Sequence, residues 1–132
     1  MVDTLGLVLK VLVTEANVPE RSGAQWLLTA LGDQFPRLKL IWVDGGFSGE
    51  DFIKRIAQKC NLTLQVVKRP DDAKGFVLLH RRWVVERTFA WLGNYRRLSK
   101  DYEYSLYSAD ATIYAAMTHL MLRRLARLNA HP

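Results

Sequence analysis

The chain has 132 residues, about half of them hydrophobic, which suits one domain with one core and argues against a disordered chain. Its formal net charge is +6 and its pI is about 9.7, so we expect an anionic partner, nucleic acid before a membrane surface. No apolar run is long enough to span a membrane and the first residues do not form a signal peptide, so the prediction is a soluble, cytoplasmic protein.

The first predicted elements are two short strands, over residues 2–5 and 8–14, which are rich in Val and Leu. A tight turn around Gly6 separates them. Asp3 stands just before this turn, and we interpret it as a turn residue rather than a catalytic acid, because Asp commonly serves turns.

A helix over residues 22–31 and a strand over residues 38–43 follow. Ser22 and Gln25 have the spacing of a capping box, in which each side chain accepts a hydrogen bond from a free backbone N–H at the helix start. Residues 38–43 are a continuous apolar run, which is typical of a strand buried on both faces.

A second helix is predicted from Ser48 to Cys60, with Glu50 and Asp51 in its first turn, where the helix dipole favours acids. Cys60 is the only cysteine, which excludes a disulfide within the chain and a cysteine metal cluster. We expect it to be a partly buried, inert thiol. Residues 62–67 predict another strand.

The positive charge is concentrated between Lys68 and Lys100. This stretch holds nine Lys or Arg residues and three acids, so it carries +6, and the rest of the chain sums to zero. Residues 68–75 read as a charged loop, and residues 76–79 as a short strand or a lead into the next helix. A basic patch, rather than a generally basic protein, is the prediction.

Two helices complete the chain. The first, over residues 81–93, contains Glu86, which is the only carboxylate between Asp72 and Asp101. The second is long and is capped by Ser108. Its predicted buried stripe comprises Ile113, Met117, Leu120, Met121, Leu125 and Leu128.

Helices alternate with strands along most of this order, which predicts an α/β fold in a single domain over residues 1–132. We expect a mixed β-sheet with a parallel part, flanked by helices and followed by the long C-terminal helix. Ligands of such sheets gather at the carboxyl ends of the strands. The functional site is therefore expected where a strand ends.

Asp44 occupies such a position, directly after the strand over residues 38–43 and before Gly45 and Gly46. The strand would hold the carboxylate, and the glycines would let another backbone or a phosphate approach closely. The alternative is an ordinary strand-to-helix turn, in which Asp-Gly is common.

Glu86 has two interpretations. It could form a surface ion pair with Arg82, four residues earlier, worth a few tenths of a kcal/mol. It could instead share a Mg²⁺ ion with Asp44, because such ions take one or two carboxylates and leave positions for phosphate oxygens. Basic side chains would then hold the phosphodiester. The candidate DNA-binding residues are Arg81, Arg82, Arg87, Arg96, Arg97 and Lys100.

The chain resembles the C-terminal part of bacterial insertion-sequence transposases of the DDE type. The segments that carry the resemblance are residues 2–7 (VDTLGL), 42–49 (WVDGGFSG) and 81–92 (RRWVVERTFAWL), and residues 94–103 (NYRRLSKDYE) continue the third. The resemblance covers nearly the whole chain. It implies an RNase H-like fold and phosphoryl transfer on DNA with two metal ions, Mg²⁺ or Mn²⁺.

On this resemblance, Asp44 matches the second acid of the catalytic triad and Glu86 the third, and both would be metal ligands. Arg82 matches the Arg that precedes the Glu by four residues in the family signature. The signature's Tyr falls on Leu79 and its Lys near Gly93, so those two functions would pass to Arg81, Arg96 or Arg97.

The first acid of the triad has no counterpart, because Asp3 aligns with a position after the first strand of the family fold. We therefore expect an incomplete, N-terminally truncated RNase H-like domain without that strand, inactive or impaired in isolation, because two carboxylates cannot build the symmetric two-metal clamp. The sheet edge left exposed would favour pairing with another chain.

Two other functions stay open. The basic patch could belong to a non-enzymatic, DNA-binding or oligomerising truncated product that modulates a full-length transposase. A small metal-dependent phosphoesterase acting on non-nucleic substrates is the other reading, but no third acid or His near a strand end supports it. The expected partners are DNA and either a second copy or a full-length transposase.

Overall fold

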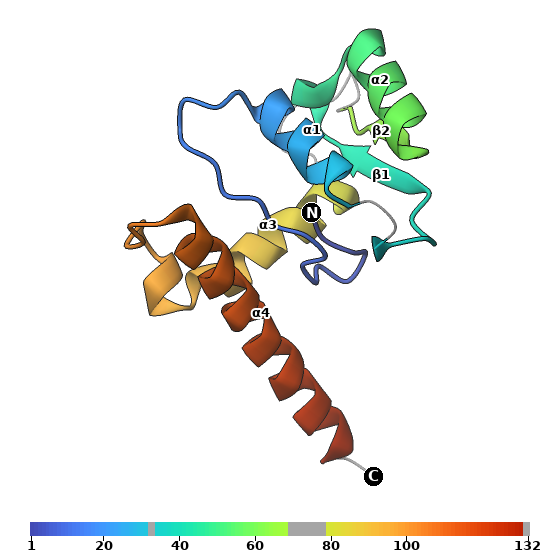
Figure 1. Ribbon diagram of the computed structural model, residues 1–132. Helices are drawn as coiled ribbons and strands as arrows, with labels where there is room; N and C mark the ends of the chain where they lie inside the picture. The colour runs from blue at the N-terminus through green and yellow to red at the C-terminus, as the bar shows by residue number, and fades with distance from the viewer. Residues whose placement is uncertain (32–33, 69–78, 131–132) are drawn as a thin grey trace, which may run out of the picture. The chain divides into compact units, whose positions relative to one another are not determined.

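The computed structural model describes residues 1–31, 34–68 and 79–130, and the chain divides into two compact units (Figure 1). The central unit is Ala16–Trp83, and the terminal unit combines Met1–Glu15 with Val84–Pro132. The predicted charged loop over residues 68–75 and short strand over residues 76–79 fall almost wholly outside the described residues.

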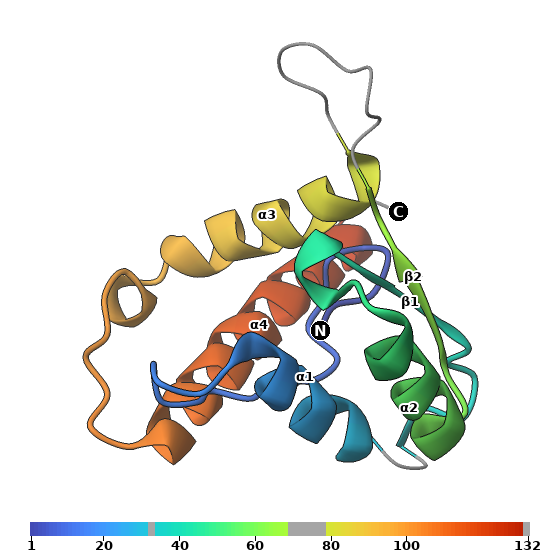
Figure 2. The same ribbon diagram turned by 90° about the horizontal axis from the view of Figure 1, so that it is seen from above.

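The central unit is built on a βαβ crossover. β1 (Leu40–Val43) and β2 (Thr63–Val66) pair in parallel, and α2 (Glu50–Cys60) connects them. A parallel pair needs such a crossover, because a tight turn can only join antiparallel strands. Figure 2 shows α2 running alongside the two strands that it joins. The strands and the helix that the sequence predicts here are therefore present, in slightly shorter form.

The core of the central unit lies where α2 packs against β2 and against α1 (Glu20–Thr29). Ile56 is 1% exposed, and the buried apolar set is Leu28, Leu31, Phe52, Ile56, Leu62 and Leu64. In α2 the acids Glu50 and Asp51 occupy the first turn as expected, and Cys60 is partly buried.

Two details of the central unit differ from the sequence prediction. Ser22 and Gln25 form no capping box, because α1 begins earlier, with Pro19 at its N-cap and no side-chain cap. Strand β1 is not buried on both faces. Leu40 and Trp42 alternate with less exposed residues, since among the described strands β1 pairs with β2 alone.

The terminal unit packs its N-terminal segment against α3 (His80–Gly93), which begins in the central unit, and α4 (Leu106–Asn129). The core comprises the buried residues Leu92, Ala116 and Met117, with Leu7, Val8, Tyr95, Leu98, Ile113, Leu120 and Met121 packed around them. The short helix η3 (Arg96–Leu98) lies between α3 and α4.

The N-terminal turn docks on α3 through Gly6. The buried hydroxyl of Thr88 donates a hydrogen bond to the Gly6 carbonyl at 2.7 Å. Gly6 has a φ of +83°, and a Cβ there would lie 2.8 Å from Thr88 Oγ1. Only glycine meets both conditions without strain. Asp3 is confirmed as a turn residue, because its Oδ1 accepts hydrogen bonds from the Leu5 and Leu7 N–H groups.

The predicted strands over residues 2–5 and 8–14 are both wrong. The described structure has an isolated antiparallel bridge between Val2 and Val8, and the following residues are irregular. Their backbone donors bind side chains of α4 instead of another strand: the Val11 N–H donates to Tyr114 Oη and the Val13 N–H to Asp110 Oδ1.

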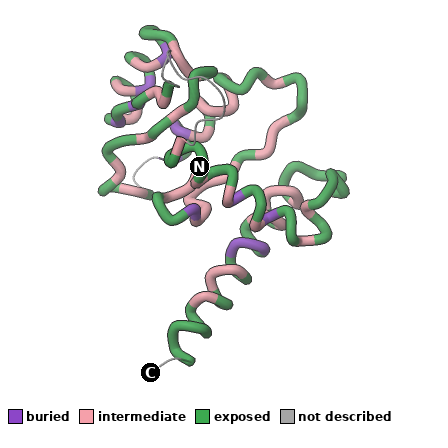
Figure 3. Tube along the Cα trace, turned by 180° about the vertical axis from the view of Figure 1, so that it is seen from behind, coloured by how far each residue is buried: buried purple, intermediate pink, exposed green. Residues whose placement is uncertain are grey.

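Helix α4 is confirmed but differs at both ends. It begins at Leu106, after Ser105, and the Ser108 hydroxyl lies inside the first turn, where it donates to the Ser105 carbonyl. The predicted stripe is buried only in its first half. Leu125 is 56% and Leu128 73% exposed, and Figure 3 shows the exposed C-terminal end of the helix.

Candidate active site

Asp44 follows β1 directly and is the N-cap of the short helix η2 (Gly45–Phe47). Its Oδ1 accepts a hydrogen bond from the Gly46 N–H at 3.0 Å, which closes an Asx turn. A Cβ at position 46 would lie 3.2 Å from the same oxygen, so glycine leaves room for the carboxylate. The predicted Asp44 position, at the carboxyl end of a strand, is present in the structure.

The strand end beside Asp44 is part of the parallel pair. Val43 is in register with Val66, and the Val67 N–H donates to the Val43 carbonyl at 2.8 Å. The hydrogen-bonded ladder therefore continues to the residue before Asp44. It holds the backbone of Asp44 on one side while the side chain remains exposed.

Arg21, which the sequence analysis did not single out, holds the other side of this loop. From α1, its Nε donates to the Gly46 carbonyl at 3.0 Å and its Nη2 to the Ser48 carbonyl at 2.7 Å. A guanidinium group presents several N–H donors in a rigid plane, so one side chain can fix two carbonyls. No motif marks Arg21, because its two acceptors lie 25 and 27 residues further along the chain.

Trp42 lies in β1, two residues before Asp44, and contacts two further side chains of the central unit. Its indole Nε1 donates to Gln65 Oε1 at 2.9 Å across the strand pair. The Arg81 guanidinium lies over its ring, 4.2 Å from the centroid. This cation–π contact gives Arg81, a candidate DNA-binding residue, a defined position beside β1.

Glu86 lies in the part of α3 that belongs to the terminal unit, and it is exposed. Asp44 belongs to the central unit, and a metal ion shared by the two carboxylates stays a prediction. Among the residues that the structure describes, no group of three or more His, Cys, Asp or Glu could hold a metal ion. The metal ligands predicted from the sequence are two carboxylates. Two carboxylates suit a hard cation such as Mg²⁺, whose remaining coordination positions would be filled by water and phosphate oxygens.

The candidate DNA-binding residues differ in how they are held. Arg82, Arg96 and Lys100 are exposed. Arg87 is only partly exposed, because its Nη2 donates to the Leu5 carbonyl at 2.9 Å and its guanidinium lies over the Trp91 ring. Arg87 therefore helps to hold the N-terminal turn on α3, a role for which the sequence carries no signal.

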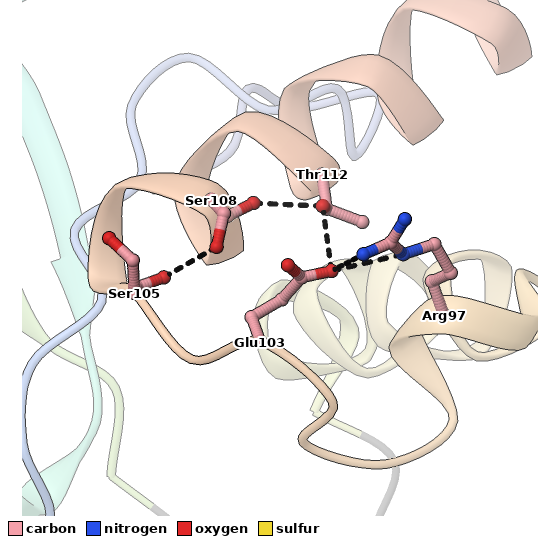
Figure 4. A network of polar contacts seen from close by, with 5 residues as sticks. All are labelled: Arg97, Glu103, Ser105, Ser108 and Thr112. Carbon is pink, nitrogen blue, oxygen red and sulfur yellow. Dashed lines mark hydrogen bonds and ion pairs between the residues drawn. The ribbon is translucent and has the colours of Figure 1, made fainter.

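Arg97 is bound to Glu103 in a polar network between η3 and α4 (Figure 4). Its Nε and Nη2 lie 3.0 and 2.8 Å from Glu103 Oε1, and the Thr112 hydroxyl donates to the same oxygen. A hydrogen bond from Ser108, together with Arg97 and Thr112, lowers the pKa of Glu103 below its usual range. Glu103 is therefore a charged anchor at physiological pH.

No helix in the described ranges combines the length and apolar character that crossing a membrane would require.

Comparison with known proteins identifies one family. Residues 1–121 match the model of the transposase DDE domain family. The chain is also 29% identical, over 108 residues, to a Burkholderia cepacia protein named as a candidate transposase for insertion sequence element IS402. That alignment covers 76% of this chain and 50% of the relative, so the chain spans about half the relative's length. No solved structure is significantly similar to the chain.

Proposed function

Because the chain belongs to the transposase DDE domain family, we propose that it takes part in the cleavage and transfer of DNA strands during transposition. The family match over residues 1–121 is the observation that carries this proposal. The position of Asp44 after a parallel strand supports it, since α/β proteins bind ligands at the carboxyl ends of their strands. We propose an RNase H-like fold for the domain.

In this proposal Asp44 and Glu86 are the second and third carboxylates of the catalytic triad and hold a divalent metal ion, Mg²⁺ or Mn²⁺. When bound, such an ion supplies an activated oxygen nucleophile and stabilises the leaving oxygen. Asp44 is suited to its part because β1, the Gly46 N–H and Arg21 restrict the loop that carries it. A restricted ligand loses little entropy when it binds.

The basic residues position the DNA. We propose that Arg82, Arg96 and Lys100 contact phosphate oxygens, since these side chains are exposed and cationic. Arg81, which stacks on Trp42, the partly exposed Arg87 and the exposed Arg97 would add positive charge for DNA binding. Arginine suits this task because its planar fork binds phosphate bidentately.

On the resemblance, Asp44 and Glu86 match the second and third acids of the family triad, and no residue of the 132 is assigned to the first. We therefore propose that this polypeptide by itself cleaves DNA weakly or not at all. Two carboxylates would supply ligands for one ion, whereas the family reaction uses two. The proposed protein partners are a second copy or a full-length transposase.

The test is a nicking assay on DNA that carries the ends of the element, with Mg²⁺ or Mn²⁺, combined with calorimetric titration of Mn²⁺. We expect weak cleavage or none, and Mn²⁺ binding that Asp44→Ala or Glu86→Ala reduces. Asp51→Ala, an exposed acid on α2, is the matched control and should leave Mn²⁺ binding unchanged. Efficient cleavage that survives loss of either carboxylate would refute the proposed site.

A second candidate function is favoured by the charge distribution. The stretch from Lys68 to Lys100 carries the entire net charge of the chain, and DNA binding needs no complete triad. We propose as the alternative a non-enzymatic DNA-binding protein that competes with, or assembles with, a full-length transposase. Its DNA binding would depend on the arginines and not on Asp44.

A further inference from the structure

Three exposed tyrosines lie near the start of α4: Tyr102 and Tyr104 in the connection after η3, and Tyr107 in the first turn of the helix. Tyr102 is 57%, Tyr104 107% and Tyr107 88% exposed. Large aromatic side chains usually bury most of their surface, and when they are exposed together they mark an interaction site. We call these three residues the tyrosine loop.

The tyrosine loop is held in place by Glu103, which stands between Tyr102 and Tyr104. The Glu103 side chain is only 9% exposed, and it binds Arg97 of η3 and Thr112 of α4 (Figure 4). The residue between the two tyrosines is therefore anchored inward while both neighbours are exposed. Rings displayed on an anchored segment lose little conformational entropy when they bind a partner.

Positively charged residues precede the tyrosine loop in the sequence. Arg96 and Lys100 are exposed, and the Arg97 side chain is 70% exposed although it binds Glu103. Exposed aromatic rings beside exposed Lys and Arg are the combination that binds single-stranded nucleic acid, where bases stack on rings and cations hold the phosphates.

We propose that the tyrosine loop stacks on unpaired bases of the DNA, with Arg96 and Lys100 on the phosphates of the same strand. The inference rests on the proposed function, in which DNA is the substrate. Unpaired bases are required because duplex bases are already stacked on each other and present only their edges in the grooves. Strand cleavage at an element end provides such bases wherever the end opens.

The test compares two DNA probes on the full 132-residue chain at one salt concentration. One probe is a blunt duplex, and the other is the same duplex with a short single-stranded tail. We expect the tailed duplex to bind about tenfold more tightly, which corresponds to about 1.4 kcal/mol and lies within the range of base stacking on one ring.

Substitutions assign this preference to the rings. Tyr104→Leu combined with Tyr107→Leu should remove most of the tail preference, whereas Tyr104→Phe with Tyr107→Phe should keep it, because stacking needs the ring and not the hydroxyl. Trp26→Leu is the matched control, an aromatic residue 54% exposed on α1 of the central unit, and should not change the preference.

A second measurement on the unaltered chain covers the case in which the leucine variants fail to fold. A 2-aminopurine base in the tail should change its fluorescence on binding if a ring stacks on it, and should not change in the duplex part. Salt-dependent duplex binding with no tail preference and no 2-aminopurine response would overturn the inference and leave the proposed function standing. Absence of binding to either probe would instead overturn both.

Discussion

Asp44 is held from three directions inside the central unit. Strand β1 fixes its backbone, the Gly46 N–H binds its Oδ1 at 3.0 Å, and Arg21 binds the carbonyls of Gly46 and Ser48. The two Arg21 bonds involve a charged donor, and bonds of this kind contribute about 1.5–3 kcal/mol each where they are shielded from water and less where they are exposed. Arg21 is thus a positioning residue for the loop that carries Asp44.

Substitution of Arg21 should loosen this loop. In Arg21→Lys and Arg21→Gln variants one side chain can no longer fix both carbonyls, so the amides of Phe47 and Ser48, which close the η2 turn, should exchange about tenfold faster with solvent hydrogen. Hydrogen exchange followed by NMR is the measurement. Arg55→Gln, on α2, is the control, and equal exchange in all variants would contradict the positioning role.

Glu103 makes the stability of the terminal unit depend on pH. Its pKa is lowered from its usual value because Ser108, Arg97 and Thr112 bind its charged form. A carboxyl whose pKa is lowered in the folded state adds stability above its unfolded pKa and loses it as the pH falls through its folded pKa. The contribution of Glu103 is therefore complete at neutral pH and is lost in acid, as the pH falls through this lowered pKa.

Glu103→Gln should therefore destabilise the chain at pH 7 and have a smaller effect at an acidic pH at which the Glu103 carboxyl is protonated in the folded chain. Urea unfolding at the two pH values measures the difference. Glu50→Gln is the control, because Glu50 and Lys54 form an exposed ion pair that contributes little at either pH. An equal loss of stability for Glu103→Gln at both pH values would show that its charge is not what matters.

At the scale of elements, the N-terminal turn and α3 form one packed motif. Thr88 donates to the Gly6 carbonyl, Arg87 donates to the Leu5 carbonyl, and a Cβ on Gly6 would also lie 3.0 Å from Trp91 Cζ3. The ring of Trp91 carries a second guanidinium, that of Arg124 from α4, 4.2 Å from its centroid. The helix that contains Glu86 is therefore held from the N-terminal segment and from α4.

Gly6→Ala should break this contact. The new methyl group meets Thr88 Oγ1 at 2.8 Å, and alanine disfavours a φ of +83°, so we expect a loss of about 1–3 kcal/mol in the free energy of unfolding. Denaturant unfolding measures it. Gly93→Ala, where a Cβ meets nothing within 4 Å, should change stability by no more than about 1 kcal/mol. Similar effects for both substitutions would argue against the docking of Gly6 on α3.

The C-terminal half of α4 is an element with an exposed apolar surface. Leu122, Leu125 and Leu128 are each more than half exposed, whereas Met117 in the first half is 1% exposed. Apolar residues recur at helical spacing along the whole of α4. Among the described residues, however, the hydrophobic core of the terminal unit packs only against the first part of the helix. The predicted buried stripe therefore fails at its last two residues, Leu125 and Leu128.

At the scale of the whole molecule, the net charge of +6 dominates the expected behaviour with DNA. Each phosphate contact releases a counterion, so affinity for DNA should fall steeply as salt is raised. This holds for the proposed transposase function and for the DNA-binding alternative, because both use the same arginines. Metal binding at Asp44 is what separates them.

Arg82→Ala and Arg96→Ala should each weaken duplex binding and lower the slope of log affinity against log salt by about 0.9, the value for one phosphate contact. Fluorescence anisotropy across a salt series is the measurement. Asp44→Ala should leave the slope unchanged, because a carboxylate makes no direct contact with phosphate. A slope that neither arginine affects would place the DNA elsewhere on the protein.

Local patterns in the sequence were sufficient for the helices, for the two paired strands and for the family. The crossover β1–α2–β2, the helix of Glu86 and the long α4 follow from apolar periodicity and from acids in a first helical turn, which are short-range properties of the chain. Asp44 was found for the same reason, because a strand followed by Asp-Gly-Gly is a local signal. The resemblance to DDE transposases is likewise carried by contiguous segments, and the family match confirms it.

Contacts between distant residues required the folded chain. Arg21 binds carbonyls 25 and 27 residues away, Thr88 binds Gly6 across 82 residues, and Val13 binds Asp110 across 97. Side chains of α4 bind the backbone N–H groups of Val11 and Val13, and the segment around them is irregular instead of forming a strand. The spacing of apolar residues indicates which residues could be buried. Whether they are buried depends on which other parts of the chain pack against them.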